Sequence, residues 1–220
     1  MTHEERMQIF EQIDIGCVTD GLIRFGVGGW TRHLRPVNSA AKIYGRAFTA
    51  RFDIVTPPRE MITPMEVIDM SEPGDVLVWN ANLETNLMGG NIFAFAVRHG
   101  ANGIVLDGYN RDSGEINELG GAVFSCGSSC GSSPVNFKAT RDTINIPVNI
   151  DGVTVRPGDY ICGDCDGVMV IPYEYVDLVL AQAQKYMEWE GRVKEAINNG
   201  YNAQQMKAVY ASIELLDCEI

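Results

Sequence analysis

The chain has 220 residues, a length that suits one well-buried domain with an appended segment. With 45% hydrophobic and 21% charged residues, it has the composition of a globular protein, which excludes wholesale disorder. Its 17 Lys and Arg residues against 29 Asp and Glu residues give a net charge of -12, which argues against a nucleic-acid partner.

Membrane and secretory segments are not expected either. No apolar run approaches the roughly 18 residues that a membrane helix requires, and the polar start of the chain lacks the apolar stretch of a secretory signal. We therefore expect no membrane partner and a cytoplasmic location. The six cysteines are too few for a disulfide scaffold in a chain of this length, so we expect free thiols.

The first part of the chain predicts two helices and a long strand. Residues 4–15 carry apolar side chains at helical spacing. Thr19 or Asp20 is expected to cap a short second helix. Alternation over residues 45–55 then predicts a strand, and a helix that contains Pro64 follows.

The next stretch predicts a strand, a helix and a second strand. Buried strands are expected at residues 75–79 and 103–107, and the Gly89-Gly90 turn between them leads into a helix over residues 92–98. This order makes a βαβ unit with at least one parallel pair and a right-handed crossover.

Beyond Gly120 the pattern changes to short strands separated by turn signals, which predict an antiparallel or mixed sheet. These strands are expected at residues 122–125, 144–150, 153–155, 160–162 and 167–171. From Tyr173, apolar residues recur every three or four positions and predict a long amphipathic helix that ends at Gly200. A further helix is expected over residues 203–216. The fold class is therefore α/β.

The turn at Gly89-Gly90 is a candidate anion site. Because it opens a helix directly after a strand, its free backbone N–H groups and the helix dipole attract negative charge. A plain tight turn explains the same residues, and the turn alone does not distinguish the two. It contains neither a Walker loop nor a dinucleotide fingerprint.

A second candidate follows the second strand of the βαβ unit, at the strand end where α/β sheets bind ligands. Arg111 offers a planar fork that fits a carboxylate. Asp112 and Glu115 are three residues apart, so they share a helical face and could hold a divalent cation. A surface ion pair with a Glu in the first helical turn is the other explanation, and these residues alone leave both open.

Two cysteine pairs, Cys126 with Cys130 and Cys162 with Cys165, suggest a zinc site, since four thiolates can bind zinc. Against this, Cys162 and Cys165 fall in a predicted strand, turn and strand, and no His-Cys repeat supports them. We therefore favour thiols without a metal.

The spacing of these motifs resembles a known family. Gly90 is followed after twenty residues by Arg111 and Asp112, and then by Glu115 after two more, which is similar to the signature of the RraA-like proteins. The similarity extends over residues 13–197 through blocks in the same order. These blocks are Val18–Asp20, Gly45–Thr49, Glu72–Val78, Gly103–Gly108 and Pro157–Pro172.

The resemblance implies a swivelling β/β/α-type fold, a homotrimer or homohexamer, and active sites between subunits. In the metal-dependent pyruvate aldolases of this family, backbone amides and an arginine bind a small 2-oxo acid, and an aspartate holds Mg2+ or Mn2+. Carried over by position, Arg111 and Asp112 are the catalytic residues, and Asp112 is the metal ligand. The backbone positions expected to bind the substrate are Gly89, Gly90, Asn91 and Ile92.

Two further acids follow from the resemblance. Some family aldolases carry an acid where Gly90 stands, and others have glycine there and an acid three residues after the metal aspartate. This chain follows the second pattern, so Glu115 is expected to supply the missing carboxylate. Glu190 is the positional match for an acid that an adjacent subunit brings to the metal.

The resemblance therefore implies a cytoplasmic, metal-dependent lyase that cleaves 4-hydroxy-2-oxo acids or decarboxylates oxaloacetate to pyruvate. Residues 1–198 would form its catalytic domain and residues 199–220 a helical extension. The alternative is a non-catalytic regulator that binds a ribonuclease or another protein. Such regulators in this family lack the metal site, so Glu115 favours the enzyme.

Overall fold

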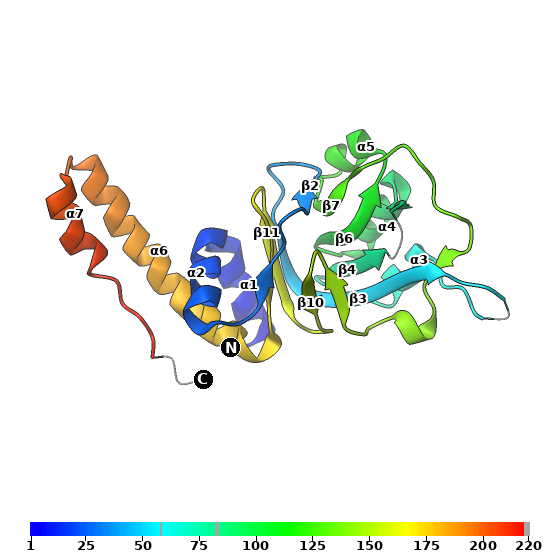
Figure 1. The fold of residues 1–220 in the computed structure, drawn as a ribbon, viewed down its shortest axis with the longest axis horizontal. Coiled ribbons are helices and arrows are strands. Elements are labelled where there is room, and N and C mark those ends of the chain that lie inside the picture. Colours follow the sequence, from blue (N-terminus) through cyan, green and yellow to red (C-terminus); the bar gives the residue numbers. More distant parts are fainter. Residues whose placement is uncertain (58, 82–83, 218–220) are drawn as a thin grey trace. The chain divides into compact units, whose positions relative to one another are not determined.

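The computed structural model describes residues 1–57, 59–81 and 84–217 (Figure 1). Its contacts divide the chain into two compact units. One unit joins Met1–Gly28 with Glu174–Ile220, and the other is Gly29–Tyr173. The predicted division at residue 198, between a catalytic domain and an extension, stays a prediction. Among the described residues, no helix combines the length and the apolar character that a membrane crossing requires.

The unit Gly29–Tyr173 is built on a ten-stranded mixed sheet in the order β1-β12-β11-β3-β4-β6-β7-β2, with β5 paired to β6 and β8 to β3. A separate two-stranded sheet joins β9 and β10. The strands are β1 Gly29–Trp30, β2 Arg35–Pro36, β3 Ile43–Ile54, β4 Val76–Ala81, β5 Asn86–Met88, β6 Gly103–Asn110, β7 Val123–Ser128, β8 Phe137–Lys138, β9 Val148–Ile150, β10 Val153–Val155, β11 Tyr160–Asp164 and β12 Gly167–Ile171.

The centre of this sheet is parallel. β4 runs parallel to β3 and to β6, with Val78 opposite Val105, and β7 runs parallel to β6. Helix α4 (Gly90–His99) lies between β4 and β6 in the chain, so the predicted βαβ unit is present. The second half is mixed, one of the two predicted arrangements, because β7 pairs parallel with β6 whereas β11 and β12 pair antiparallel. The predicted α/β class is confirmed.

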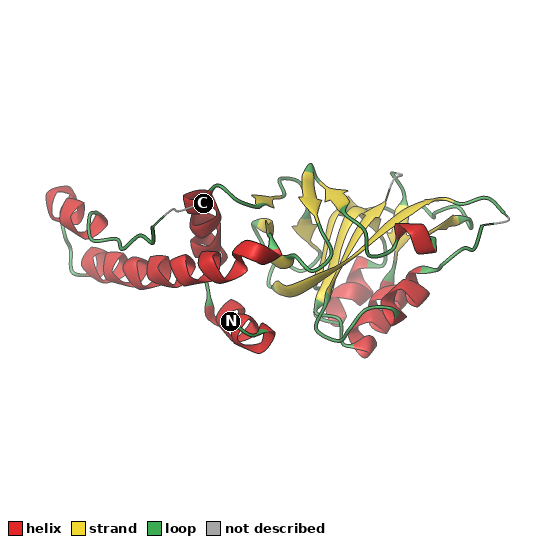
Figure 2. Cartoon of the chain, turned by 90° about the horizontal axis from the view of Figure 1, so that it is seen from below, coloured by secondary structure: helices red, strands yellow, loops and turns green. Residues whose placement is uncertain are grey.

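Both faces of the central strands are buried, which explains their almost continuous apolar sequences. Leu77 and Trp79 of β4 belong to the core cluster that includes residues of α3 (Pro64–Asp69), α4 and α5 (Ser113–Glu118). Figure 2 shows these helices on one face of the sheet. Val76 and Val78 point to the opposite face and join a second cluster with residues of β9 to β12.

The predicted helix that contains Pro64 is present, and Pro64 is its first residue, where a proline costs no hydrogen bond, with Thr63 as its cap. One local expectation in this unit was wrong. The strand expected over residues 144–150 begins only at Val148. Asn145 has a left-handed backbone, with φ of 55°, and Pro147 has no N–H to donate, so both interrupt regular pairing.

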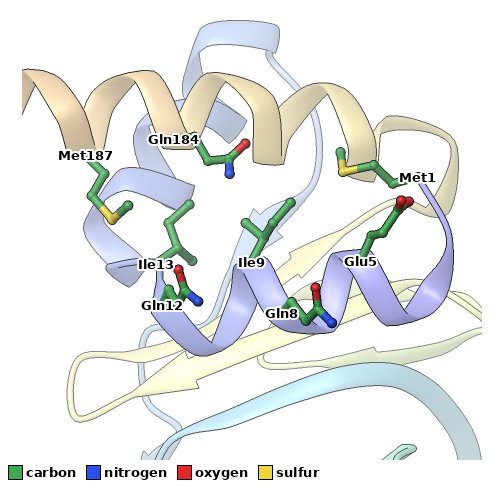
Figure 3. A pocket seen from close by; sticks show the side chains of 8 residues that line it. All are labelled: Met1, Glu5, Gln8, Ile9, Gln12, Ile13, Gln184 and Met187. Atoms are coloured by element: carbon green, nitrogen blue, oxygen red, sulfur yellow. The ribbon is translucent and has the colours of Figure 1, made fainter.

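The unit of the two chain ends is helical, with α1 His3–Gln12, α2 Ile15–Phe25, α6 Val176–Asn198 and α7 Ala203–Tyr210. α2 packs closely on α6, where Gly21 faces the backbone of Val179. A pocket of about 430 Å³ lies between α1 and α6 and includes Ile9, Ile13 and Met187 in its lining (Figure 3).

The helix boundaries here also differ from those expected. The helix expected over residues 4–15 stops at Gln12, because Asp14 caps a new helix by accepting the N–H of Gly16 at 2.8 Å. Thr19 and Asp20 therefore lie inside α2 and cap nothing. The last helix is shorter than residues 203–216, since α7 ends at Tyr210.

Candidate functional site

The predicted site residues meet at the ends of two parallel strands. β5 ends at Met88 and β6 ends at Asn110, and these two residues are partners in the sheet. Gly89 and Arg111, which follow them, are therefore neighbours. The backbone N–H of Arg111 donates to the carbonyl of Met88 at 3.1 Å and holds the two chain segments together.

The two glycines leave the space that the acidic side chains occupy. A Cβ atom at Gly89 would collide with Oδ2 of Asp112 and would lie 3.2 Å from Cγ of Arg111. A Cβ atom at Gly90 would collide with the carboxylate of Glu115. Gly89 is the N-cap of α4 and has no side chain that could cap the helix. Asp112 and Glu115 therefore lie beside a helix N-terminus that its own N-cap residue does not cap.

Asp112 has an unusual backbone and partly free oxygens. Its φ of 58° and ψ of 39° place it in the left-handed region, where Asp and Asn are the best tolerated residues after glycine. Oδ2 accepts the N–H of Gly90 at 3.2 Å and lies 3.5 Å from Nε of Arg111. Oδ1 has no hydrogen-bond partner among the described residues, so it can still take a ligand.

The donor set of this site fits a hard divalent cation. The carboxylate of Glu115 is exposed and makes no hydrogen bond with any described residue. Together with Asp112 it offers two carboxylates beside a half-exposed arginine. One or two carboxylates that leave room for water and substrate oxygens are what Mg2+ prefers in enzymes.

The backbone amides at the start of α4 are only partly available. The N–H of Gly90 is used by Asp112, and that of Ile92 donates to the carbonyl of Gly89 at 3.1 Å. The N–H groups of Gly89 and Asn91 have no partner within the described part of the chain. The binding of substrate by the backbone at Gly89, Gly90, Asn91 and Ile92 stays a prediction.

A pocket of about 440 Å³ opens beside these groups. Its lining consists of Arg111, Asp112, Ser113, Ser128, Ser129 and Cys130. Ser128, at the end of β7, and Ser129 and Cys130, in the loop that follows, were not predicted as site residues. The signal that could have found them is the Ser- and Gly-rich sequence that directly follows β7, but its relevance depends on β7 being the parallel neighbour of β6.

Asn110, which is fully buried, ties the two loops of the pocket together. Its Oδ1 accepts the hydroxyl of Ser125 at 2.7 Å, and its Nδ2 donates to Ser113 at 3.1 Å and to Ser128 at 3.3 Å. Ser113 belongs to the segment that carries Asp112, and Ser128 ends β7. The amide therefore fixes the position of the segment after β6 relative to β7.

Glu190 lies on α6, in the helical unit of the chain. It accepts a hydrogen bond from Lys194 at 3.1 Å. Burial, together with the charge of Glu190, raises the pKa of the Asp20 carboxyl and raises the pKa of the Cys17 thiol to about 12. Its contribution to a neighbouring subunit's site stays a prediction.

The cysteines do not assemble a four-thiolate site in the described residues, where the one metal-competent group of three is Asp164 with Cys165 and Asp166 in the turn between β11 and β12. Cys162 is buried in β11, and burial raises the pKa of its thiol. Burial and Asp107 raise the pKa of Cys126 to about 11, so both thiols stay protonated near neutral pH.

Known proteins resemble this chain in both sequence and fold. The family model for RraA-like proteins, described as Aldolase/RraA, matches residues 15–170. A protein of Halalkalibacterium halodurans with the provisional name 4-hydroxy-4-methyl-2-oxoglutarate aldolase is 29% identical over 196 residues, which cover 88% of this chain and 89% of that protein.

Two solved structures share the fold. An uncharacterized protein from Pseudomonas syringae is 25% identical and superposes with a TM-score of 0.84 over 95% of each chain. RraAS2 from Streptomyces coelicolor, described as an unusual member of the RNase ES inhibitor RraA protein family, is 25% identical. It superposes with a TM-score of 0.74 over 86% of this chain and 96% of that one.

Proposed function

Because this chain belongs to the RraA-like family, and because two carboxylates and an arginine converge at a helix N-terminus, we propose that it is a divalent-metal-dependent lyase acting on 2-oxo acids. Its reactions would be the cleavage of 4-hydroxy-2-oxo acids and the decarboxylation of oxaloacetate, each releasing pyruvate. The observation that carries the proposal is the glycine pair that makes room for Asp112 and Glu115.

Asp112 and Glu115 would hold Mg2+ or Mn2+. A bound cation of this kind supplies a Lewis acid that draws electron density from the 2-oxo group. The free Oδ1 of Asp112 and the exposed carboxylate of Glu115 support this assignment, because hard divalent cations prefer carboxylate oxygens.

Arg111 would bind the carboxylate of the 2-oxo acid. Its guanidinium is half-exposed, and the contact with Asp112 at 3.5 Å leaves its terminal nitrogens for a ligand. A planar fork holds a carboxylate through two parallel hydrogen bonds and so fixes the plane of the substrate. The same positive charge stabilises the negative charge that develops on the substrate's oxygen when the C–C bond breaks.

The two reactions place different demands on the protein. In aldol cleavage the 4-hydroxyl must lose its proton to a base, and the pocket lining contains no histidine. The carboxylate in this lining belongs to Asp112, which is already assigned to the cation, so the base would be a water molecule or a carboxylate outside the lining. Decarboxylation of oxaloacetate releases CO2 without any proton abstraction, so it is the simpler reaction for this site.

A protein-binding regulator is the second candidate, favoured by the structural similarity to RraAS2. It would use the same fold to bind a ribonuclease or another protein and would not need Asp112 or Glu115.

The proposed lyase, in contrast, would be a cytoplasmic homotrimer or homohexamer in which Glu190 of an adjacent subunit completes each site.

One assay distinguishes the two candidates. Pyruvate release from oxaloacetate is measured after EDTA treatment and after addition of Mg2+ or Mn2+, with subtraction of the metal-catalysed background. The lyase is expected to lose its rate with EDTA and recover it with metal. If pyruvate release with the protein never exceeds the background rate without it, the lyase proposal is refuted. A screen of 4-hydroxy-2-oxo acids then identifies the preferred substrate.

A further inference from the structure

Two serine hydroxyls on the wall of the candidate pocket form a pair that the proposed chemistry does not use. Ser113 and Ser128 line the same pocket as Arg111 and Asp112. Their Oγ atoms are 2.6 Å apart, so one hydroxyl donates to the other. Ser113 is the first residue of α5 and Ser128 the last residue of β7, and Asn110 ties these two segments together.

A count of hydrogens shows that one donor is left over. The Nδ2 group of Asn110 donates to both serine oxygens, and more distantly, at 3.5 Å, to the carbonyl of Arg111. This nitrogen is a donor only, so neither serine can donate back to it. The two hydroxyls carry two hydrogens, and the contact between them uses one. The second hydrogen has no acceptor among the described residues, and the pocket is the open space beside it.

The buried amide fixes this arrangement. Oδ1 of Asn110 accepts from Ser125, which fixes the orientation of the amide and directs Nδ2 toward the serine pair. Either hydroxyl can be the donor within the pair, so the leftover hydrogen belongs to one or the other of two oxygens that the amide holds in place. A pair of oxygens positioned before a ligand arrives loses little conformational freedom on binding.

We infer that the Ser113–Ser128 pair is a specificity-determining contact that recognises an acceptor oxygen at the far end of the substrate, such as a second carboxylate. This inference rests on the proposed function, because Arg111 is taken to hold the carboxylate next to the 2-oxo group. A 2-oxo acid that ends in a methyl group would leave the donor unpaired and bind more weakly.

The test compares two stable five-carbon 2-oxo acids that differ at one end. 2-Oxoglutarate ends in a carboxylate, and 2-oxopentanoate ends in a methyl group. Their dissociation constants are measured by isothermal titration calorimetry with Mn2+ present. The parent protein is expected to bind 2-oxoglutarate about tenfold more tightly, the preference that one hydrogen bond to a charged group provides.

The variants are Ser113→Ala, Ser128→Ala and the double substitution. Each single variant keeps one hydroxyl, whose hydrogen is released from the serine pair and can serve the ligand, so it retains most of the preference. The double variant is expected to lose the preference, with unchanged affinity for 2-oxopentanoate. Ser132→Ala, an exposed serine of the same loop outside the pocket lining, is the matched control.

The outcomes separate this inference from the proposed function. A parent that binds both acids equally, or a double variant that keeps the parent's preference, overturns the role of the serine pair. A double variant that binds both acids less well in equal proportion also overturns it, since that result shows a structural role. Pyruvate release by the same preparations, absent in every metal condition, overturns the proposed function instead.

Discussion

Gly90 has no space for even one more carbon atom, because the carboxylate of Glu115 occupies the position of its missing side chain. Backbone conformation does not require glycine there, since Gly90 is the first residue of an ordinary helix. Its requirement is steric and depends on a residue 25 positions later in the sequence. The glycine and the acid therefore act as one feature of the site.

We expect Gly90→Ala to displace Glu115 and to weaken Mn2+ binding about tenfold, a loss typical of displaced groups around a metal. Calorimetric titration with Mn2+ measures the change. Gly114→Ala is the matched control, because a Cβ atom at Gly114 meets nothing within 4 Å. Equal Mn2+ affinity in both variants would show that Glu115 is not a ligand.

Asp112→Asn isolates the charge of the proposed metal ligand. Asparagine also tolerates the left-handed backbone at this position, so the fold is expected to persist. Loss of the carboxylate should weaken Mn2+ binding by about tenfold or more, since a neutral amide oxygen is the poorer ligand for a hard cation. A titration that gives the parent's affinity contradicts the assignment.

Arg111→Lys tests the bidentate contact with the substrate. Lysine keeps the positive charge but has no planar fork, so the substrate's carboxylate loses its fixed orientation. We expect kcat/KM for oxaloacetate to fall about 100-fold, which is the cost of a small misplacement in an active site. Because Arg111 is half-exposed, the melting temperature should stay the same. Near-normal turnover in the Arg111→Lys variant would show that Arg111 only forms a surface ion pair with Asp112.

At the scale of the elements, helix α2 packs on α6 through a glycine. A Cβ atom at Gly21 would lie 3.0 Å from the carbonyl oxygen of Val179, a contact so tight that the backbone of α6 must give by a few tenths of an ångström. Gly21→Ala should therefore cost about 1–3 kcal/mol of packing, partly offset by about 1 kcal/mol of helix propensity.

Chemical unfolding followed by circular dichroism measures the net effect of Gly21→Ala, which is expected to lower the unfolding midpoint. Gly191→Ala on α6 is the control, since its Cβ atom would meet nothing within 4 Å and only the propensity gain applies. A higher midpoint for both variants would mean that α2 and α6 adjust freely.

Regular elements could be predicted where one local signal dominates. The apolar runs of β4 and β6, with the glycine pair between them, were enough to predict their parallel pairing. The break between α1 and α2 was predicted too late in the chain because the apolar periodicity continues through it, and it is the side chain of Asp14 that caps the new helix. Local polar contacts of this kind override a periodic pattern.

The charged residues of the candidate site could be predicted from their types and their spacing in the sequence, but the pocket around them could not. Arg111, Asp112 and Glu115 stand out because their types and intervals are specific. Ser128 was missed because a serine at the end of a strand gives no chemical signal, and its place in the pocket depends on the pairing of β7 with β6. Long-range pairing is not encoded in a local pattern.

At the scale of the whole molecule, the proposed assembly makes Glu190 part of a shared site. We expect light scattering at micromolar concentration to show a trimer or hexamer. Glu190→Gln should lower the rate of pyruvate release without changing the mass of the particle. A fully active monomer would refute the shared site. If the Glu190→Gln protein is an oligomer and keeps full activity, the site can still be shared, but Glu190 is not part of it.

The division of the chain into its two units also bears on how the protein is made. The sheet unit is a continuous stretch, Gly29–Tyr173, whereas the helical unit needs both Met1–Gly28 and Glu174–Ile220. On the ribosome the sheet unit can fold as soon as it emerges, since domains generally fold as units during synthesis. Helix α2 must wait for α6, so its apolar face stays without its partner during most of translation. The first residues synthesised are therefore among the last to be buried.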